Sequence, residues 1–432
     1  MKITKYETNI KDNVCFDTLE IKEREIDIYW EWSLLSIDEA TSYKWLGLGS
    51  SITESACINL KKLPIKERNN LIDDYFKNLN LQFLRLPIGS CDFSLNSYTY
   101  LDEFNKFSIK NDLKTIIPFV KDALKTNSHI KLISSPWTPP SNWKSNNSMY
   151  EGGNLLKEHF HDYADYLVNY IREYQKNDLN IAYITIQNEP FAKQRWESCL
   201  WSLDDMKEFI YNFLIPKLKA ENIKVKVLLW DHNKENLFKI INHLYVPNEY
   251  IGGVAFHSYS GTHFKELEMI KSKYPELMLI ETEYCHSFES YDEDKWLTSA
   301  ELYLWDILGN INNGMQAFID WNILLDSNGG PNHKENYCKS PVILNINNTS
   351  YIKTPIYYYL KHLALIPINA KIVNSSIYRD DLKCCVFEDG DNLYIIALNI
   401  TNNPIELCFT IENKLIQEKI LPHEIVTYNV KK

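Results

Sequence analysis

Residues 181–190 read IAYITIQNEP, a run of apolar and β-branched residues that turns polar at its end. Residues 277–284 read LMLIETEY and repeat this pattern later in the chain. A short apolar run that ends abruptly in polar residues is typical of a parallel strand buried on both faces. In an α/β protein such strands alternate with helices. The same unit is therefore expected along the rest of the chain.

Six further apolar runs alternate with longer amphipathic segments, such as residues 155–174, in which apolar residues recur every three or four positions. Eight β/α alternations predict a (β/α)8 TIM barrel. The alternative is a doubly wound sheet, but residues 47–51 read GLGSS and lack the third glycine of a GxGxxG phosphate loop. The six further runs are 45–51, 83–88, 130–137, 225–231, 253–259 and 317–322.

The two ends of the chain have a different pattern. From about residue 371, short strand-like runs are separated by turns, at 382–387, 393–400, 405–411 and 420–428, which is typical of a β-sandwich. The first residues also alternate, as in Ile26 to Trp30, and we expect them to join the same sheet. The predicted domains are therefore N-terminal sandwich strands at 1–44, a barrel at 45–365 and C-terminal sandwich strands at 366–432.

Composition narrows the function classes. A formal net charge of −11 argues against nucleic acid or an anionic membrane as the main partner. No run approaches the ~18 to 20 apolar residues that cross a bilayer. The opening residues, MKITKYE, lack the apolar core of a signal peptide, and nine irregularly spaced cysteines do not suggest a disulfide framework. We therefore expect a cytoplasmic protein without stable membrane insertion, and the oligomeric state stays open.

Glu189 and Glu283 are the candidate catalytic residues, because a carboxylate at the end of a buried strand is costly to desolvate. Two such carboxylates can cleave a glycosidic bond, one by protonating the leaving oxygen and one by attacking the sugar. For Glu189 the acid role requires a raised pKa, and a salt bridge at the barrel rim is the alternative explanation. Asn188 beside it could bind a sugar 2-hydroxyl.

Glu283 has a rival in Glu281, because residues two apart on a strand face the same way. We expect Glu281 to lie one pleat deeper in the barrel, either paired or protonated, and Glu283 to lie at the rim. His257 and Tyr259, at the end of the preceding strand, could orient Glu283. A structural histidine is the alternative for His257.

Four further residues are candidate substrate-binding residues: Trp137, Trp321, Asp92 and Asn332. The indole rings could stack on a sugar, although both could instead belong to the core. The turn at 329–332, GGPN, could project Asn332 inward.

We expect no metal or other cofactor. His159 and His161 diverge on a helix, and the Cys285-His286 pair offers no third ligand.

Several blocks of this chain, taken in order, resemble glycoside hydrolase family 30, the family of acid β-glucosidase (glucosylceramidase). The resemblance implies a (β/α)8 barrel with a β-sandwich built from both termini, and retaining hydrolysis of a β-glycoside. The blocks are residues 47–59, RLP at 85–87, SCDFS at 90–94, YTY at 98–100, SPWTPP at 135–140, NEP at 188–190, TEYC at 282–285, DWN at 320–322 and GGPN at 329–332.

By the same resemblance, Glu189 falls at the acid/base position and Glu283 at the nucleophile position of the family. The residues that match its nonreducing-end sugar site are Asp92, Trp137, Asn188, Trp321 and Asn332. This chain departs from the family pattern at Gln187, at Glu281, in the loop after Glu189 and around His232.

The leading hypothesis is therefore a retaining, exo-acting β-glucosidase that uses double displacement, with a β-glycoside as its carbohydrate substrate. Its two carboxyl groups should lie ~5 to 5.5 Å apart. Within the same chemistry, β-xylosidase, β-fucosidase and β-1,6-glucanase activities stay open. A non-catalytic carbohydrate-binding barrel is the alternative from another class.

Overall fold

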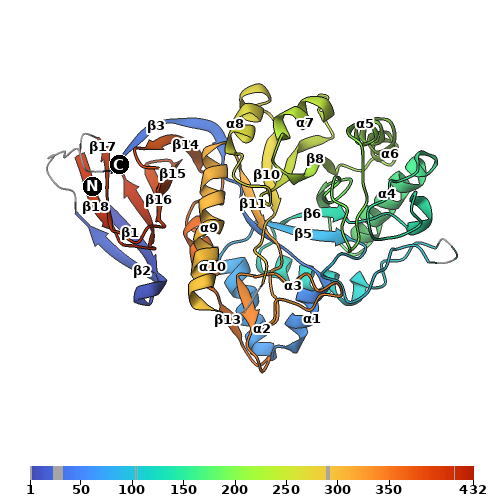
Figure 1. Ribbon diagram of the computed structural model, residues 1–432, viewed down its shortest axis with the longest axis horizontal. Helices are drawn as coiled ribbons and strands as arrows, with labels where there is room; N and C mark the ends of the chain where they lie inside the picture. Colours follow the sequence, from blue (N-terminus) through green and yellow to red (C-terminus); the bar gives the residue numbers. More distant parts are fainter. Residues whose placement is uncertain (1, 23–32, 103, 105, 289–291, 413) are drawn as a thin grey trace. The chain divides into compact units, whose positions relative to one another are not determined.

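The computed structural model describes residues 2–22, 33–102, 104, 106–288, 292–412 and 414–432. The predicted barrel is confirmed: eight parallel strands close in the order β10-β11-β4-β5-β6-β7-β8-β9 (Figure 1). Each strand lies within one of the eight predicted apolar runs or extends it by at most two residues. The strands are β4 (Gly47–Ser51), β5 (Phe83–Ile88), β6 (Lys131–Pro136), β7 (Ile181–Ile184), β8 (Lys226–Asn233), β9 (Ile251–His257), β10 (Met278–Glu283) and β11 (Ala317–Asp320).

Helices alternate with these strands along the chain. Local sequence explains where several of them begin: the Thr53 side chain accepts the Ala56 N–H at the start of α1, and Ser202 caps α5 in the same way. The helices are α1 (Glu54–Lys62), α2 (Ile65–Asp73), α3 (Ile116–Thr126), α4 (Phe160–Lys176), α5 (Leu203–Glu208), α6 (Ile215–Ala220), α7 (Leu237–Leu244), α8 (Phe264–Lys273), α9 (Glu293–Asn312) and α10 (Pro355–Ala364).

A second set of strands forms a curled mixed sheet of N- and C-terminal segments, as predicted for the β-sandwich domain. Its order is β18-β17-β3-β14-β15-β16-β19-β1-β2. One hydrophobic core joins β17 and β18 to β1 and β19, so the sheet must curve to bring its distant parts together. The strands are β1 (Lys2–Asn9), β2 (Val14–Ile21), β3 (Ser33–Lys44), β14 (Lys371–Ile377), β15 (Leu382–Asp389), β16 (Asn392–Asn399), β17 (Ile405–Ile411), β18 (Lys414–Ile420) and β19 (Ile425–Lys431).

The sequence pattern located these strands less well than the barrel strands. The predicted run 420–428 combines the end of β18 with the start of β19, because apolar residues continue across the turn between them. The predicted alternation at 26–30 lies outside the described residues. A further two-stranded sheet pairs β12 (Val342–Leu344) with β13 (Tyr351–Lys353).

The chain divides into two compact units. One holds residues 48–290 and 318–352, and the other holds residues 1–47, 291–317 and 353–432. This division places α9 and α10 in the unit of the curled sheet, so it differs from the sequence-based limits at 45 and 365, which stay a prediction.

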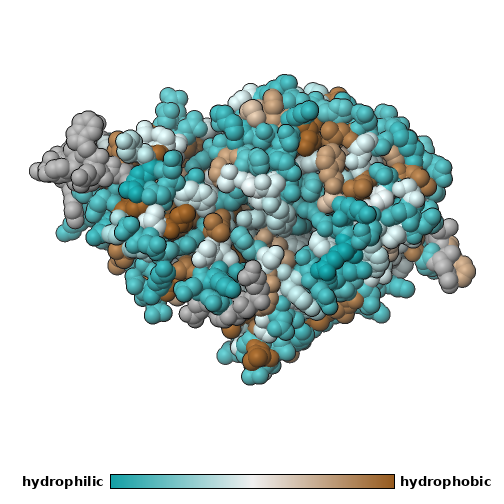
Figure 2. Space-filling model, viewed as in Figure 1, coloured by the Kyte–Doolittle hydropathy of each residue, from teal (hydrophilic) through white to brown (hydrophobic). Residues whose placement is uncertain are grey.

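The face in Figure 2 is mainly hydrophilic, with apolar residues scattered over it. Within the described part of the chain, no helix combines the length and the apolar character needed to cross a bilayer.

Candidate active site

A cavity of about 420 Å³ lies among loops and strand ends of the barrel unit, within the size range of small-molecule sites. Seven of the residues singled out from the sequence line it: Asp92, Trp137, Asn188, Glu189, Tyr259, Glu283 and Trp321. His257 is fully buried next to the lining residue Glu189, and Asn332 does not line the cavity. The structure adds other lining residues, among them Trp196, His232, Cys285, Asn336 and Cys338.

Glu283 ends β10 and is held through both carboxylate oxygens. Arg85, fully buried on β5, donates from Nη1 to Oε2 at 2.6 Å, and the Tyr259 hydroxyl donates to Oε1 at 3.0 Å. Both groups are donors, so together they fix the two oxygens of the carboxylate in place. Arg85 also donates from Nη2 to Asn188 Oδ1 at 2.7 Å, which fixes the Asn188 side chain beside Glu189.

Asp231 on β8 is a second, fully buried partner of Arg85, at 3.1 Å. Burial alone would raise the pKa of Asp231, but Arg85, His257 and Thr282 together hold it well below its usual range. Asp231 also accepts hydrogen bonds from Ser135 and Thr185, at 2.8 and 2.7 Å. It is therefore an anion at the centre of the barrel and balances the charge of Arg85.

Two β-bulges aim these side chains inward. On β8 the register with β9 shifts between Trp230 and His232, and Trp230 and Asp231 have φ of 82° and 74°. Positive φ is rare for such residues and costs of order 1–3 kcal/mol each, which proteins tolerate mostly at functional sites. On β10 the register with β9 shifts between Glu281 and Glu283. The two bulges interrupt the regular alternation of side chains, so that Thr282 reaches Asp231 and His232 reaches Glu189.

The bulge on β10 brings two consecutive side chains to the barrel interior: Thr282 donates to Asp231 Oδ1 at 2.6 Å, and Glu283 contacts Arg85. The expected pairing or protonation of Glu281 stays a prediction. Glu281 is fully buried and does not line the cavity.

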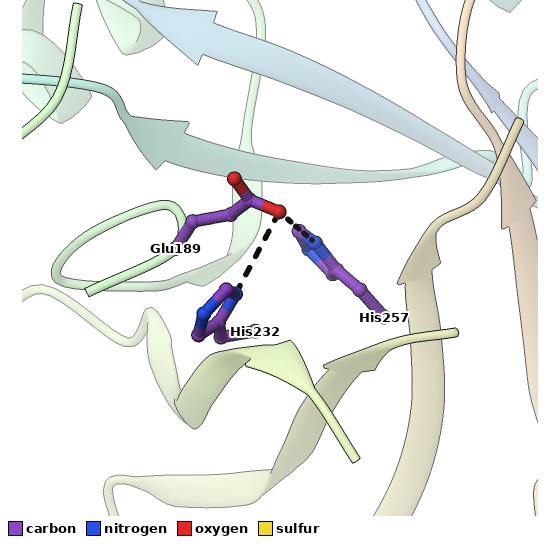
Figure 3. A group of neighbouring side chains, drawn as sticks. All are labelled: Glu189, His232 and His257. Atoms are coloured by element: carbon purple, nitrogen blue, oxygen red, sulfur yellow. Dashed lines mark hydrogen bonds and ion pairs between the residues drawn. The ribbon is translucent and has the colours of Figure 1, made fainter. Parts of the chain in front are cut away.

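Glu189 follows β7 with a φ of 49° and lies between two histidines (Figure 3). His257 Nδ1 and His232 Nδ1 approach the same oxygen, Oε1, at 3.4 and 3.6 Å. Gln194 donates to the other oxygen at 3.4 Å. Burial would raise the pKa of Glu189, but the two histidines outweigh it and hold that pKa well below its usual range. We expected the opposite direction from the sequence.

His257 lies between two carboxylates. Its Nε2 is 3.3 Å from Asp231 Oδ1, and its Nδ1 faces Glu189. Burial opposes the charged ring, but the charges of Glu283, Asp231 and Glu189 raise the pKa of His257 to about 9. The raised pKa favours the imidazolium form of the ring, with Glu189 as its counter-ion.

Aromatic rings form one wall of the cavity. The rings of Trp137 and Trp321 stack at 5.2 Å, and the Arg85 guanidinium lies 4.9 Å from the centroid of Trp137. Phe93 packs edge-on against Trp321. The two tryptophans therefore belong to a buried cluster and also line the cavity, so the two alternatives predicted from the sequence are both present.

The structure places Asn336 where we expected Asn332. Asn336 donates from Nδ2 to Asp92 Oδ2 at 2.8 Å and lines the cavity. The Asn332 side chain instead accepts the backbone N–H groups of Lys334 and Asn336, so it closes its own turn. Burial, opposed by the Asn336 hydrogen bond, raises the pKa of Asp92 to about 7.

Two thiols lie in the same wall. Cys285 Sγ is 3.2 Å from Cys338 Sγ and 3.6 Å from the Tyr259 hydroxyl.

A group of potential metal ligands was missed in the sequence. The ligand atoms of Glu189, His232 and His257 lie within 4.8 Å of one another. They come from three different strand ends, so no spacing in the sequence reveals them. Arg85 and Asp231 also come from different strands, so no spacing in the sequence reveals their contact. A charged residue inside an apolar run is nevertheless a signal that could have identified each of them.

Comparison with known proteins agrees with this geometry. Residues 46–366 match the model of the glycosyl hydrolase family 30 TIM-barrel domain. The putative glucosylceramidase 1 of Caenorhabditis elegans is 32% identical over 358 residues, which cover 76% of this chain and 68% of the relative. Mouse lysosomal acid glucosylceramidase is 27% identical over 413 residues, 88% of this chain and 80% of that protein. The crystal structure of SrfJ from Salmonella typhimurium covers both chains fully, with a TM-score of 0.93 and 29% identity.

Proposed function

Because this chain belongs to glycosyl hydrolase family 30 and is a glycoside hydrolase, we propose that it is a retaining, exo-acting β-glucosidase of the glucosylceramidase type. One observation carries the proposal: two carboxylates with opposite surroundings face one cavity. Glu283 is held by the donors Arg85 and Tyr259, which suit a nucleophile. Glu189 lies beside His257, whose raised pKa lets it share a proton with that carboxylate, which suits an acid/base.

In the first step, Glu283 attacks the anomeric carbon while Glu189 protonates the departing oxygen, which leaves a glycosyl ester on Glu283. In the second step, Glu189 takes a proton from water, and the oxygen of that water displaces Glu283 from the sugar. Arg85 and Tyr259 keep the attacking carboxylate in place. Asn188, fixed by Arg85, can bind the 2-hydroxyl, a contact that strengthens in the transition state.

The proton for the first step belongs to the Glu189–His257 pair. Before substrate binds, we place it on His257, whose Nδ1 is 3.4 Å from Glu189 Oε1. A bound sugar excludes water and makes the separated charges less stable, so the proton moves to Glu189. The pair thus reconciles an ionised Glu189 in the free enzyme with an acid in the complex.

The cavity supports exo action on a single terminal hexose. Its volume of about 420 Å³ suits a small ligand, and the Trp137–Trp321 wall offers apolar surface for a sugar ring. Asp92 and Asn336 form a hydrogen-bonded pair at the cavity, where they can bind outer hydroxyls of the sugar.

Trapping tests the assignment directly. A 2-deoxy-2-fluoro β-glucoside with an activated leaving group should inactivate the enzyme with time, and peptide mapping should place the label on Glu283. A Glu283→Gln variant is the matched control and should take no label. A label on Glu281, or inversion of configuration at the anomeric carbon in the released sugar, would contradict the proposal.

Substrate specificity is tested separately. Aryl β-glycosides of glucose, xylose, fucose and galactose, together with β-1,6-glucan, should show the highest kcat/KM for the glucoside. Preference for xylose, fucose or the glucan would replace the glucosidase assignment within the same chemistry. Binding of these sugars without any turnover would instead favour a carbohydrate-binding barrel.

A further inference from the structure

We infer that Glu189, His232 and His257 form a binding site for a divalent transition-metal ion of the Zn²⁺ type, and that the bound ion blocks the acid/base carboxylate. Oε1 of Glu189 is 3.4 Å from His257 Nδ1 and 3.6 Å from His232 Nδ1. Ligands of a tetrahedral Zn²⁺ at ~2.0–2.1 Å are about 3.3–3.5 Å apart. The 3.4 Å separation already suits an ion placed between the side chains, and the 3.6 Å separation exceeds this range by about 0.1 Å. Figure 3 shows that both rings face the carboxylate.

His257 is oriented as metal-binding histidines usually are. Its Nε2 faces Asp231 Oδ1 at 3.3 Å, which directs the other nitrogen, Nδ1, toward Glu189. A carboxylate behind a histidine fixes the ring and raises its basicity as a ligand. Asp231 is itself held by Arg85, Ser135 and Thr282, so this support is rigid.

His232 brings a buried nitrogen whose contact with Glu189 Oε1, at 3.6 Å, is longer than a hydrogen bond. Among the described residues, none is within hydrogen-bond distance of its Nδ1, although that atom is buried. A buried polar atom without a partner is costly, and a metal ion would satisfy it. The bulge between Trp230 and His232 is what turns this ring toward Glu189.

Charge favours a cation at this place. Within the described part of the site, Arg85 contacts the carboxylates of Asp231 and Glu283, whereas Glu189 has the two histidines and Gln194 as neighbours. The ion would replace the Nδ1 proton of His257, because histidine binds a metal through an unprotonated nitrogen. Glu189 and His232 line the cavity, so a metal ion there keeps a position open for water or a sugar hydroxyl. Two nitrogens and one oxygen suit Zn²⁺, Co²⁺ or Ni²⁺, whereas Mg²⁺ and Ca²⁺ prefer oxygen ligands.

The inhibitory part of this inference rests on the proposed function of Glu189, but metal binding itself does not. The first experiment therefore uses Co²⁺ with the full-length protein and measures visible absorption during titration. We expect a d–d band of a low-coordinate nitrogen and oxygen site that saturates at one ion per chain. His232→Gln should weaken the binding at least tenfold, and excess Zn²⁺ should abolish the band.

His243→Gln is the matched control, because His243 lies on α7, pairs with Asp204 and does not line the cavity. It should change neither Co²⁺ binding nor activity. The Cys285–Cys338 pair is the competing ligand set in the same wall. A strong near-ultraviolet thiolate band that persists in His232→Gln and is lost in Cys285→Ser would assign the ion to the thiols and overturn the inference.

The second experiment measures hydrolysis of an aryl β-glucoside at increasing Zn²⁺, with each variant normalised to its own metal-free rate. Wild type should lose activity reversibly and regain it with a chelator, and His232→Gln should need at least tenfold more Zn²⁺ for half inhibition. Co²⁺ binding without any glucosidase activity would contradict the proposed function alone. Saturated Co²⁺ binding with full activity would contradict the blocking of Glu189.

Discussion

At the scale of single residues, the site depends on pairs of groups that set one another's charge. The neighbouring histidines lower the pKa of Glu189, and the nearby carboxylates raise the pKa of His257. Burial raises the pKa of Asp92, which favours its neutral form. Such opposed shifts are what acid–base chemistry needs from one fold. They depend on contacts of 3 to 4 Å, which can each be removed by a single substitution.

Asp92 predicts a pH dependence of sugar binding. Its pKa is raised to about 7, so Asp92 is neutral below that pH and ionised above it. An ionised carboxylate accepts stronger hydrogen bonds from sugar hydroxyls, so binding of a glucose-type inhibitor should tighten as pH rises through about 7. Calorimetry across pH 5.5–8.5 should show this rise in wild type. Asp92→Asn should bind about 10- to 100-fold more weakly above pH 7 and lose the rise. An unchanged pH profile in the variant would assign the titration to another group.

Asn336 and Asn332 provide a matched pair of substitutions. Asn336→Ala removes the donor to Asp92 at the cavity and should raise KM for an aryl glucoside about tenfold, close to ~1.4 kcal/mol. Asn332→Ala removes the acceptor that closes a turn and should affect stability more than KM. Steady-state kinetics and thermal unfolding of both variants separate the two roles. The reverse result would restore Asn332 as the substrate-binding residue.

At the scale of elements, one buried network of ion pairs connects side chains on β5, β8 and β10. Arg85 bridges Asp231 and Glu283 across the barrel, and the bulges on β8 and β10 bring acceptors within reach. Removing one partner of such a network leaves a buried charge without compensation, which is far more costly than losing a surface pair.

Arg85→Gln should therefore destabilise the barrel unit by about 3–5 kcal/mol and abolish most activity. Arg172→Gln is the matched control, because Arg172 pairs with Glu221 at the surface and should cost less than about 1 kcal/mol. Urea unfolding followed by tryptophan fluorescence measures both. A loss in Arg85→Gln no larger than in the control would mean that Asp231 is neutral in the folded protein.

Two loops of the cavity wall are close enough to be cross-linked. Backbone hydrogen bonds from Lys339 to His286 and from Phe288 to Tyr337 hold the segments of Cys285 and Cys338 together. The Sγ atoms, 3.2 Å apart, need only a small movement to reach a disulfide bond at ~2.05 Å.

Incubation with oxidised glutathione should therefore give a Cys285–Cys338 disulfide. Contact with Cys285, together with burial, raises the pKa of Cys338, so the exchange should begin at the cavity-lining Cys285. Its thiolate attacks glutathione disulfide and releases one glutathione, and Cys338 then displaces the second. Mass spectrometry should show a loss of two hydrogens and the cross-linked peptide. Cys338→Ala should stop at the glutathione adduct, and the same stop in wild type would contradict the prediction.

At the scale of the whole molecule, each of the two units contains a buried titratable group that makes it sensitive to acid. In the barrel unit, Asp231 has a pKa held well below its usual range. In the sheet unit, His362 is fully buried between the hydroxyls of Thr427 and Thr8, at 2.9 and 3.0 Å. Burial lowers the pKa of His362 to about 3, so the folded protein keeps this ring neutral.

Stability should therefore fall as pH drops below about 6.5. Between pH ~6.5 and about 3 the unfolded chain binds a proton at His362 that the folded chain does not, so lower pH favours unfolding. Asp231 adds a loss below pH ~4, where the unfolded carboxylate becomes protonated first. Thermal unfolding from pH 4 to pH 7 should show a steeper decline in wild type than in His362→Gln. Parallel curves would show that His362 is already protonated when folded.

Much of this protein could be predicted from its sequence, because the determining signals are local. Apolar runs that alternate with helical periods gave all eight barrel strands, and each run is short enough to be recognised without its neighbours. Glu189 and Glu283 were identified because a carboxylate directly after such a run is physically expensive. Both now line the cavity, but their separate roles stay a prediction.

The remaining features were decided only by the tertiary structure, because they join residues that are far apart in the chain. Closure of the barrel brings Arg85 to Asp231 and Glu283, and bulges that no sequence pattern marks turn His232 toward Glu189. The folding of one loop placed Asn336, and not Asn332, in the lining of the cavity, whereas which of them binds substrate stays a prediction. The sequence by itself determined where the strands run and which carboxylates end them. The charge states of those carboxylates, and the ligand set around Glu189, depend on distances that exist only once the barrel is closed.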